Sequence, residues 1–349
     1  MNWRLLLPWC WLSIFSGSKN FRDNPVIGNT QLNKWGLHVW RKNLAHRFCQ
    51  KRRERLGKGL PQEWRDQYMQ SGFVHIDQFL APDRLQALRS EMLSHALPMI
   101  EMHQPPALTR RALLDETSCA HLPAALALLR DPRLFKLMNF VAGYPGRPII
   151  TLQCISSDAD QAGQSDPQTQ WHTDTFHSTA KAWLFLHEVS LDEGPLAYIP
   201  GSHRFDASRK SWEQSRSESA AADANAMHAK GSWRASAEDL KRMGIPVESA
   251  WQAAVAANTL VVADTGGFHR RTPSPESTVR LEIYLSLRRN PYFASLVPSV
   301  LSWPGVKQHW AHGFTQFNSF LHRQGFRVWT PAYLPGLTAR EKQRLETSE

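Results

Sequence analysis

Cysteine is scarce in this 349-residue sequence, and no pairing pattern is present. Cys10, Cys49, Cys119 and Cys154 are scattered, without a C-x-x-C spacing. This argues against a disulfide framework or a zinc cage and fits a reducing compartment. The chain also lacks the H-E-x-x-H motif of zinc proteases. Zinc-finger, helix-turn-helix and aromatic RNA-binding patterns are absent too, so nucleic acid is not an expected partner.

The apolar run at the N-terminus is short. Residues 5–15 read Leu-Leu-Leu-Pro-Trp-Cys-Trp-Leu-Ser-Ile-Phe, about half of the ~20 residues that cross a bilayer as a helix. A cleaved secretory signal fits the preceding Arg4 and the small residues that follow. The tryptophans favour instead a segment at the headgroup boundary of a membrane. Packing of these residues on the core is a further alternative.

Acidic residues are fewer than basic ones, and the excess is local. The formal net charge is +10, and residues 41–58 hold eight Lys or Arg against Glu54 alone, a local charge of +7 that leaves +3 elsewhere. Leu37, Trp40, Leu44 and Phe48 recur at helical spacing, which predicts one helix over residues 30–58 with a basic opposite side. We expect this helix to lie on an anionic membrane surface. The alternative is a solvated basic face on a helix docked to the core.

A His-x-Asp pair carries the first chemical signal. His172 and Asp174 lie in W-H-T-D-T, and on an extended segment two such side chains project from one face. Downstream, an apolar β-branched run ends at Gly266-Gly267 and delivers His269 after a turn. Two histidines and one carboxylate form the ligand set that holds non-haem Fe(II) with open coordination positions. Arg280 follows on a predicted strand and suits a bidentate clamp on a dicarboxylate.

Four landmarks together resemble the phytanoyl-CoA dioxygenase family of Fe(II)/2-oxoglutarate oxygenases. They are the W-H-T-D element, E-G-P-L-A-Y-I-P-G-S-H at residues 193–203, His269, and Arg280. Residues 72–80 resemble the first strand of the family, so the resemblance spans roughly residues 70–290.

The resemblance implies a ligand set, a fold and a reaction. His172, Asp174 and His269 would hold Fe(II), and Arg280 would bind the distal carboxylate of the co-substrate 2-oxoglutarate, with O2 as oxidant. The implied fold is α+β with a mainly β core, a double-stranded β-helix (jelly-roll, cupin-like) barrel with flanking helices. Asp174 is lost in halogenating relatives, so its presence favours hydroxylation.

The length fits one large core with appendages. We expect a membrane-associating segment at residues 1–58, the oxygenase barrel at 59–290 and a C-terminal extension at 291–349. Residues 206–250, rich in Ser, Ala and charge, predict an insertion near the site, as a lid or as a disordered excursion.

Several local elements are also predicted. Helices are expected around residues 113–115, over 124–142 and from Thr338. On a strand at residues 180–189, Lys181, Trp183, Phe185 and His187 share one face, although which face lines the pocket stays open. An exposed edge position is expected for Lys181; contact with an anionic substrate or co-substrate is the alternative. His203 is expected to be structural.

The substrate is predicted less directly. The N-terminal organisation resembles bacterial hydroxylases of Kdo, the inner-core sugar of lipopolysaccharide, which suggests Kdo-lipid A at the cytoplasmic face of the inner membrane. A soluble acyl or secondary metabolite in the cytoplasm is the alternative. A non-catalytic barrel that binds a membrane ligand ranks last, and the sequence leaves the oligomeric state open.

Overall fold

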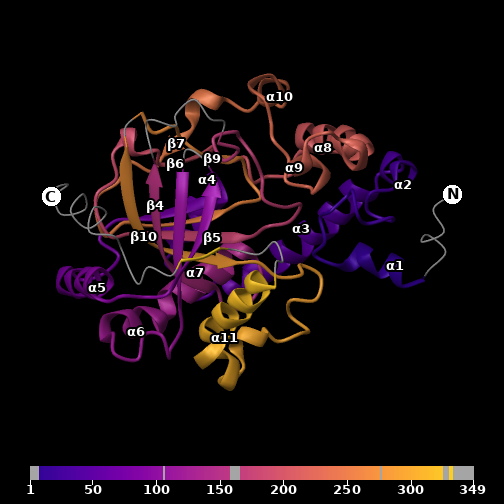
Figure 1. Ribbon diagram of the computed structural model, residues 1–349. Helices are drawn as coiled ribbons and strands as arrows, with labels where there is room; N and C mark the ends of the chain where they lie inside the picture. Colours follow the sequence, from indigo (N-terminus) through magenta and orange to yellow (C-terminus); the bar gives the residue numbers. More distant parts are fainter. Residues whose placement is uncertain (1–7, 105–106, 158–165, 276, 325–329, 333–349) are drawn as a thin grey trace.

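Two antiparallel sheets form the centre of the computed structural model, which describes residues 8–104, 107–157, 166–275, 277–324 and 330–332 (Figure 1). The large sheet has the order β1 (Phe73–Ile76), β8 (Leu260–Asp264), β5 (Ala180–Phe185), β10 (Thr278–Leu287), β4 (Ile149–Ser157), β3 (Ala107–Leu114), β2 (Met99–Gln104) and β11 (Thr330–Ala332). The small sheet has the order β7 (Trp251–Gln252), β6 (Leu196–Tyr198) and β9 (His269–Arg271). The expected α+β chain with an antiparallel core is confirmed, and the arrangement is consistent with a jelly roll.

Period-two alternation on the central strands separates a core face from a cavity face. On β10, Leu281, Ile283 and Leu285 are buried in the main hydrophobic core, whereas Arg280, Glu282 and Tyr284 line a cavity. Strand β5 behaves in the same way, with Ala182 and Leu184 in the core and Lys181, Trp183 and Phe185 facing the cavity. The prediction of Lys181 as an exposed edge residue is therefore wrong, because β5 lies between β8 and β10.

Helices pack against the core side of the large sheet: α4 (Gln62–Ser71), α5 (Pro82–Ser94), α6 (Pro123–Leu129) and α7 (Pro132–Ala142). The single helix predicted over residues 124–142 is two helices. Asp131 caps α7 by accepting from Arg133 N at 2.9 Å, and Pro132 begins the new helix because it has no N–H to donate. The helical piece predicted at 113–115 is wrong, since Leu113 and Leu114 belong to β3.

The N-terminal region comprises α1 (Pro8–Leu12), η2 (Ser13–Phe15), α2 (Thr30–Lys34) and α3 (Leu37–Leu56). Gly36, at φ +90°, interrupts the predicted helix over residues 30–58, because this left-handed backbone cannot continue an α-helix. The orientation of α3 also differs from the prediction. Arg41, Lys42 and Arg53 are buried, whereas Trp40 is 48% and Phe48 39% exposed.

The burial of these cations follows from the partners they find, since α3 packs against α7 and α8. Lys42 pairs with Glu213 of α8, and Arg53 donates to carbonyls at the end of α7. Arg41 donates to backbone carbonyls of residues 14, 16 and 18. The predicted division of this helix into an apolar side and a basic side is therefore wrong for α3, because three of its cations are buried. Within the described ranges, none of the helices has both the length and the apolar composition needed to cross a bilayer.

The insertion at residues 206–250 is folded: η4 (Leu191–Glu193) precedes α8 (Ala207–Ser219), η5 (Ala220–Ala222), α9 (Ala226–Ala229), α10 (Ala237–Arg242) and η6 (Val247–Ser249). Asp206, Asn225 and Ser236 cap α8, α9 and α10. The alternative of a disordered segment is therefore wrong, because the polar side chains of this sequence form helix caps and ion pairs that stabilise it.

The C-terminal part contains η7 (Val300–Ser302) and a long helix, α11 (Pro304–Arg323), which was not predicted. The helix predicted from Thr338 lies outside the described residues. The division of the chain after residues 58 and 290 stays a prediction.

Candidate metal centre

Three sequence-predicted residues converge at one point between the two sheets. His172 lies on an extended segment that pairs with β9, with His172 N donating to His269 O at 3.0 Å and His269 N to His172 O at 3.1 Å. Asp174 N donates to Thr265 O at 3.0 Å. As a result, ligand atoms of His172, Asp174 and His269 lie within 4.8 Å of one another.

Backbone carbonyls orient both imidazoles. Nδ1 of His172 lies 2.7 Å from Gln170 O, and Nδ1 of His269 lies 3.1 Å from Gly267 O. A ring that donates from Nδ1–H keeps its lone pair on Nε2, which is the form that binds a metal. Nε2 of His269 is buried without a hydrogen-bond partner in the described structure, 3.8 Å from Asp174 Oδ2.

The electrostatics of the cluster hold these groups in metal-binding protonation states. Burial lowers the pKa of His172 well below its usual value, and it also lowers the pKa of His269. Burial opposes ionisation of Asp174, but the Lys181 ammonium outweighs it and holds the pKa of Asp174 well below the ordinary range. The site therefore presents two neutral imidazoles and a carboxylate.

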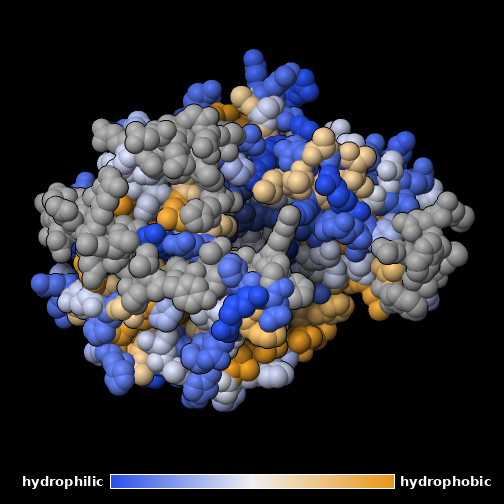
Figure 2. All heavy atoms as spheres, in the orientation of Figure 1, coloured by the Kyte–Doolittle hydropathy of each residue, from blue (hydrophilic) through white to orange (hydrophobic). Residues whose placement is uncertain are grey.

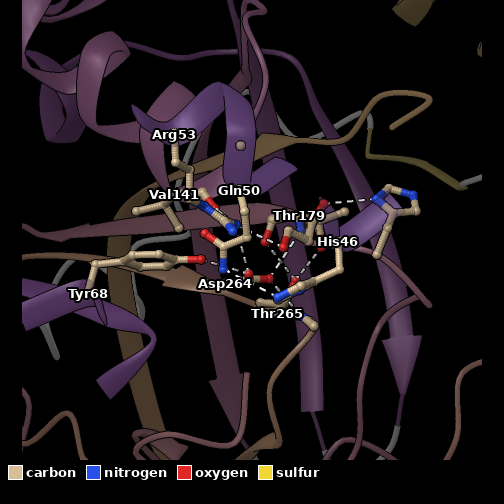
Figure 3. A network of polar contacts seen from close by, with 12 residues as sticks. His46, Gln50, Arg53, Tyr68, Val141, Thr179, Asp264 and Thr265 are labelled. Atoms are coloured by element: carbon tan, nitrogen blue, oxygen red, sulfur yellow. Dashed lines mark hydrogen bonds and ion pairs between the residues drawn. The ribbon is translucent and has the colours of Figure 1, made fainter. Parts of the chain in front are cut away.

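The turn that delivers His269 is fixed by a buried acid, Asp264, at the end of β8 (Figure 3). Its carboxylate accepts from Gly266 N at 2.9 Å, Tyr68 Oη at 3.2 Å and Thr179 N at 3.2 Å. Arg53, from α3, supplies the cation at 3.3 Å. Because Gly266 directly follows Thr265, whose carbonyl accepts from Asp174 N, the same network ties both halves of the metal cluster together.

Gly267 is required by close approach. A Cβ at this position would lie 2.0 Å from the Tyr198 hydroxyl oxygen, which itself donates to Asp264 O at 2.8 Å. The Gly-Gly pair was predicted as a tight corner before His269, and the approach of Tyr198 explains its second member.

Two distant segments brace the backbone beside His172. Trp233 and Ala235, from the insertion, pair with the metal motif through Thr173 N to Trp233 O at 3.2 Å and Ala235 N to Trp171 O at 2.8 Å. From the N-terminal region, Lys19 Nζ donates to Asp174 O. These bracing residues, like Arg53 and Asp264, were not predicted, because a local sequence pattern does not indicate which distant residue will become a partner.

The cluster opens into a cavity of about 270 Å³ between the sheets. On the face shown in Figure 2, the surface is hollowed near the centre and hydrophilic residues border the hollow. The charged residues that line the cavity are Arg111, Asp174, Lys181, Arg270, Arg271, Arg280 and Glu282. Cations thus outnumber acids five to two among the described lining residues, which favours anionic ligands.

Most of these cations already have partners. Lys181 Nζ lies 2.7 Å from Asp174 Oδ2, and Arg271 lies 3.2 Å from Asp166 Oδ2. Arg111 donates to Gln153 Oε1 at 2.6 Å, and Gln153 donates in turn to Glu282. Arg280 is 5% exposed, and within the described ranges no hydrogen bond or ion pair engages its guanidinium. An unpaired buried guanidinium facing a cavity is suited to a carboxylate ligand.

The donor set fits a transition metal. Two neutral imidazole Nε2 atoms and one carboxylate on one side of a cavity suit Fe(II) and leave room for further ligands. His203, expected to be structural, is near Tyr68, with ring centroids 5.3 Å apart, and does not join the described cluster.

Comparisons with known proteins agree with this chemistry. The sequence model of a family described as phytanoyl-CoA dioxygenase (PhyH) matches residues 68–250. No curated protein matches the sequence.

Among solved structures, the chain is similar to the non-heme alpha ketoglutarate dependent carbocyclase SnoK from nogalamycin biosynthesis, with 16% identity over 66% of this chain and 84% of that chain and a TM-score of 0.40. HygX from Streptomyces hygroscopicus with nickel and 2-oxoglutarate bound is 17% identical over 65% of this chain and 87% of that one, with a TM-score of 0.40. AviO1 from Streptomyces viridochromogenes Tue57 is 16% identical over 64% of this chain and 92% of that chain, with a TM-score of 0.38. Similarities of this size say nothing about the substrate.

Proposed function

Because the chain belongs to the phytanoyl-CoA dioxygenase family and is an Fe(II)/2-oxoglutarate-dependent dioxygenase, we propose that His172, Asp174 and His269 are the ligands of its iron. The supporting observation is the convergence of their ligand atoms within 4.8 Å. The unpartnered Nε2 of His269 adds to it, since a buried ring nitrogen without a partner is costly unless a ligand binds it.

Arg280 is the proposed partner of the distal carboxylate of 2-oxoglutarate. It lies on β10, lines the same cavity as the three ligands and is buried. A planar guanidinium can make two parallel hydrogen bonds to a carboxylate, which fixes both the position and the orientation of the co-substrate.

When bound by these residues, iron with 2-oxoglutarate and dioxygen would supply the oxidising power for hydroxylation of a C–H bond. The protein contributes orientation and exclusion of water. Gln170 O and Gly267 O fix the two imidazole rings, while Trp183 and Phe185 form an apolar wall of the cavity. This wall limits water around the reacting groups and so favours productive over wasteful turnover.

For the substrate, we propose an anionic molecule at a membrane surface, with the Kdo sugar of Kdo-lipid A as the specific candidate. The excess of cations in the cavity favours a carboxylate or phosphate ligand. A soluble acyl or secondary metabolite is the alternative, since the same cavity would accept a small soluble anion.

An exposed apolar patch favours the membrane location. Phe15, Phe48, Phe293 and Leu296 are 39%, 39%, 43% and 77% exposed and line a groove of about 660 Å³ together with Lys51, Arg52 and Arg55. Aromatic residues beside cations match the interfacial zone of an anionic bilayer. The proposed docking surface is therefore this patch, which combines the C-terminal half of α3 with Phe15, Phe293 and Leu296.

The test of the reaction is 2-oxoglutarate decarboxylation by the iron-loaded protein with Kdo-lipid A, free Kdo and soluble acyl substrates, with mass spectrometry of each product. We expect a gain of one oxygen on Kdo-lipid A. Oxygen gain only on a soluble compound would support the alternative. Absence of 2-oxoglutarate turnover by the iron-loaded wild-type protein would contradict the catalytic assignment.

Membrane docking is tested separately by co-sedimentation with vesicles of phosphatidylglycerol and phosphatidylethanolamine. Leu296→Ser and Phe48→Ser are expected to release the protein from these vesicles, whereas Val247→Ser, outside the patch, is not. Equal sedimentation of all three variants would contradict the membrane location and leave the oxygenase assignment intact.

A further inference from the structure

Lys181 occupies an unusual place for a lysine. Its ammonium lies 2.7 Å from Asp174 Oδ2, with the two side chains 25% and 24% exposed. The same carboxylate oxygen lies 3.8 Å from His269 Nε2. The strand that carries Lys181 is interior to the sheet, with Ala263 and Ser286 as its neighbours across β8 and β10. The ammonium is therefore held beside the three ligand side chains.

A divalent cation and this ammonium compete for one carboxylate. Both are attracted to Asp174, and they repel each other at short range in a partly buried site. The lysine stem has four methylene groups and can move its charge without moving β5. Metal binding is therefore expected to displace the ammonium from Asp174 toward the cavity, whose walls beside it are Trp183 and Tyr284.

A displaced ammonium requires another anion, because a buried charge without a partner is costly. Asp166 is already paired with Arg271. Glu282 keeps one carboxylate oxygen without a hydrogen-bond partner, but it lies opposite Phe185, four residues along β5 from Lys181. The dianionic co-substrate brings a carboxylate to the metal side of the cavity while Arg280 takes the other end. Exchange of Asp174 for this carboxylate keeps Lys181 paired in both states.

We propose that Lys181 is a further binding residue of the site: it neutralises Asp174 before a divalent cation binds, and it then binds the metal-side carboxylate of 2-oxoglutarate. This inference rests on the proposed function of the three ligands. It makes the binding of metal and co-substrate interdependent, because the metal releases Lys181 from the Asp174 carboxylate and the co-substrate offers Lys181 a new carboxylate.

The test uses Mn(II), which replaces iron without oxidation, and calorimetric titration of the full chain. Lys181→Met removes the charge and keeps the length of the side chain, Lys181→Arg keeps the charge, and Lys230→Met is an exposed control. We expect Lys181→Met to bind Mn(II) about tenfold more tightly without 2-oxoglutarate and to bind 2-oxoglutarate about tenfold more weakly once loaded with Mn(II), the size of one charge-assisted hydrogen bond.

Lys181→Arg and Lys230→Met are expected to stay within about threefold of wild type for both ligands. Thermal unfolding shows whether each variant is folded, and Lys181→Gln replaces Lys181→Met if that variant does not fold. Weaker Mn(II) binding by Lys181→Met would overturn the inference, because Lys181 would then merely support Asp174. Unchanged binding of both ligands would overturn it as well. Failure of the wild-type chain to bind Mn(II) would instead overturn the ligand assignment itself.

Discussion

Replacement of Arg53 by methionine probes the link between the N-terminal region and the metal centre. The Arg53 guanidinium donates to Phe140 O at 3.1 Å, Val141 O at 2.7 Å and Ser178 Oγ at 2.8 Å, and it pairs with Asp264 at 3.3 Å. Methionine fills much of the same volume but leaves the buried Asp264 carboxylate without its cation. Removal of one partner of a buried ion pair costs about 3–5 kcal/mol.

Urea unfolding followed by tryptophan fluorescence measures this cost. In a thermal scan, the same cost should lower the midpoint temperature by about 4–7 °C. Arg55→Met, an exposed position on the same helix, is the matched control and should change stability by less than about 0.5 kcal/mol. Because Asp264 also fixes the turn before His269, Arg53→Met should weaken Mn(II) binding as well.

A double-mutant cycle separates the ion pair from the other contacts of Arg53. Asp264→Asn keeps the shape of the acid without its charge, so Arg53→Met combined with Asp264→Asn should cost about 1–3 kcal/mol less than the sum of the single changes. If Arg53→Met proved no less stable than Arg55→Met, the idea that α3 supports the site through buried charge would be refuted.

Three further results are expected. Deletion of residues 1–58, which removes the buried cations of α3 and the Lys19 brace, should abolish cooperative thermal unfolding; a truncated chain with the wild-type midpoint would contradict this. Burial lowers the pKa of His203 to about 4. Above pH 6.5 this residue is neutral in both the folded and the unfolded chain, so it costs no stability there. Between pH 6.5 and pH 4 only the unfolded chain takes up the proton, so the free energy of unfolding should fall by about 1.4 kcal/mol for each unit by which the pH is lowered. In urea titrations at pH 7, 6 and 5, the free energy of unfolding should decrease less for His203→Gln than for wild type. An identical pH dependence of the two proteins would count against this role of His203. Asp174→Ala should lower Mn(II) affinity about 100-fold or more while far-ultraviolet circular dichroism stays unchanged; wild-type affinity would remove Asp174 from the ligand set.

Patterns with a short range were readable from the sequence. The two-residue spacing of His172 and Asp174, the Gly-Gly turn before His269 and the alternation around Arg280 each depend on neighbours in the chain. For this reason the strands β5, β8 and β10 were predicted, although element ends were shifted by a few residues. The mainly β core was implied by the family resemblance. The misassigned helix near Leu113 shows the limit, since a short apolar run fits a helix and a strand equally well.

The charges of α3 were misread for a physical reason. Helical periodicity places apolar residues inside and basic ones outside by default. Lys42 and Arg53 are buried instead because their counter-charges come from other parts of the chain: Glu213 from α8 pairs with Lys42, and Asp264 from β8 pairs with Arg53. Arg41 is buried against backbone carbonyls of residues 14, 16 and 18. A buried charge is costly without such partners, and the sequence does not say which residues will meet.

By itself, the sequence determined the ligand types, their local spacing and the strands that carry them, because bonded neighbours and period-two alternation fix those. Only the tertiary structure decided that His172 and His269 exchange backbone hydrogen bonds, that Lys181 turns toward Asp174, and that an N-terminal helix supplies the cation for Asp264. The most distant of these contacts joins residues 211 positions apart. The energy of each contact depends on burial and distance, and both are set only when the chain has folded around the site.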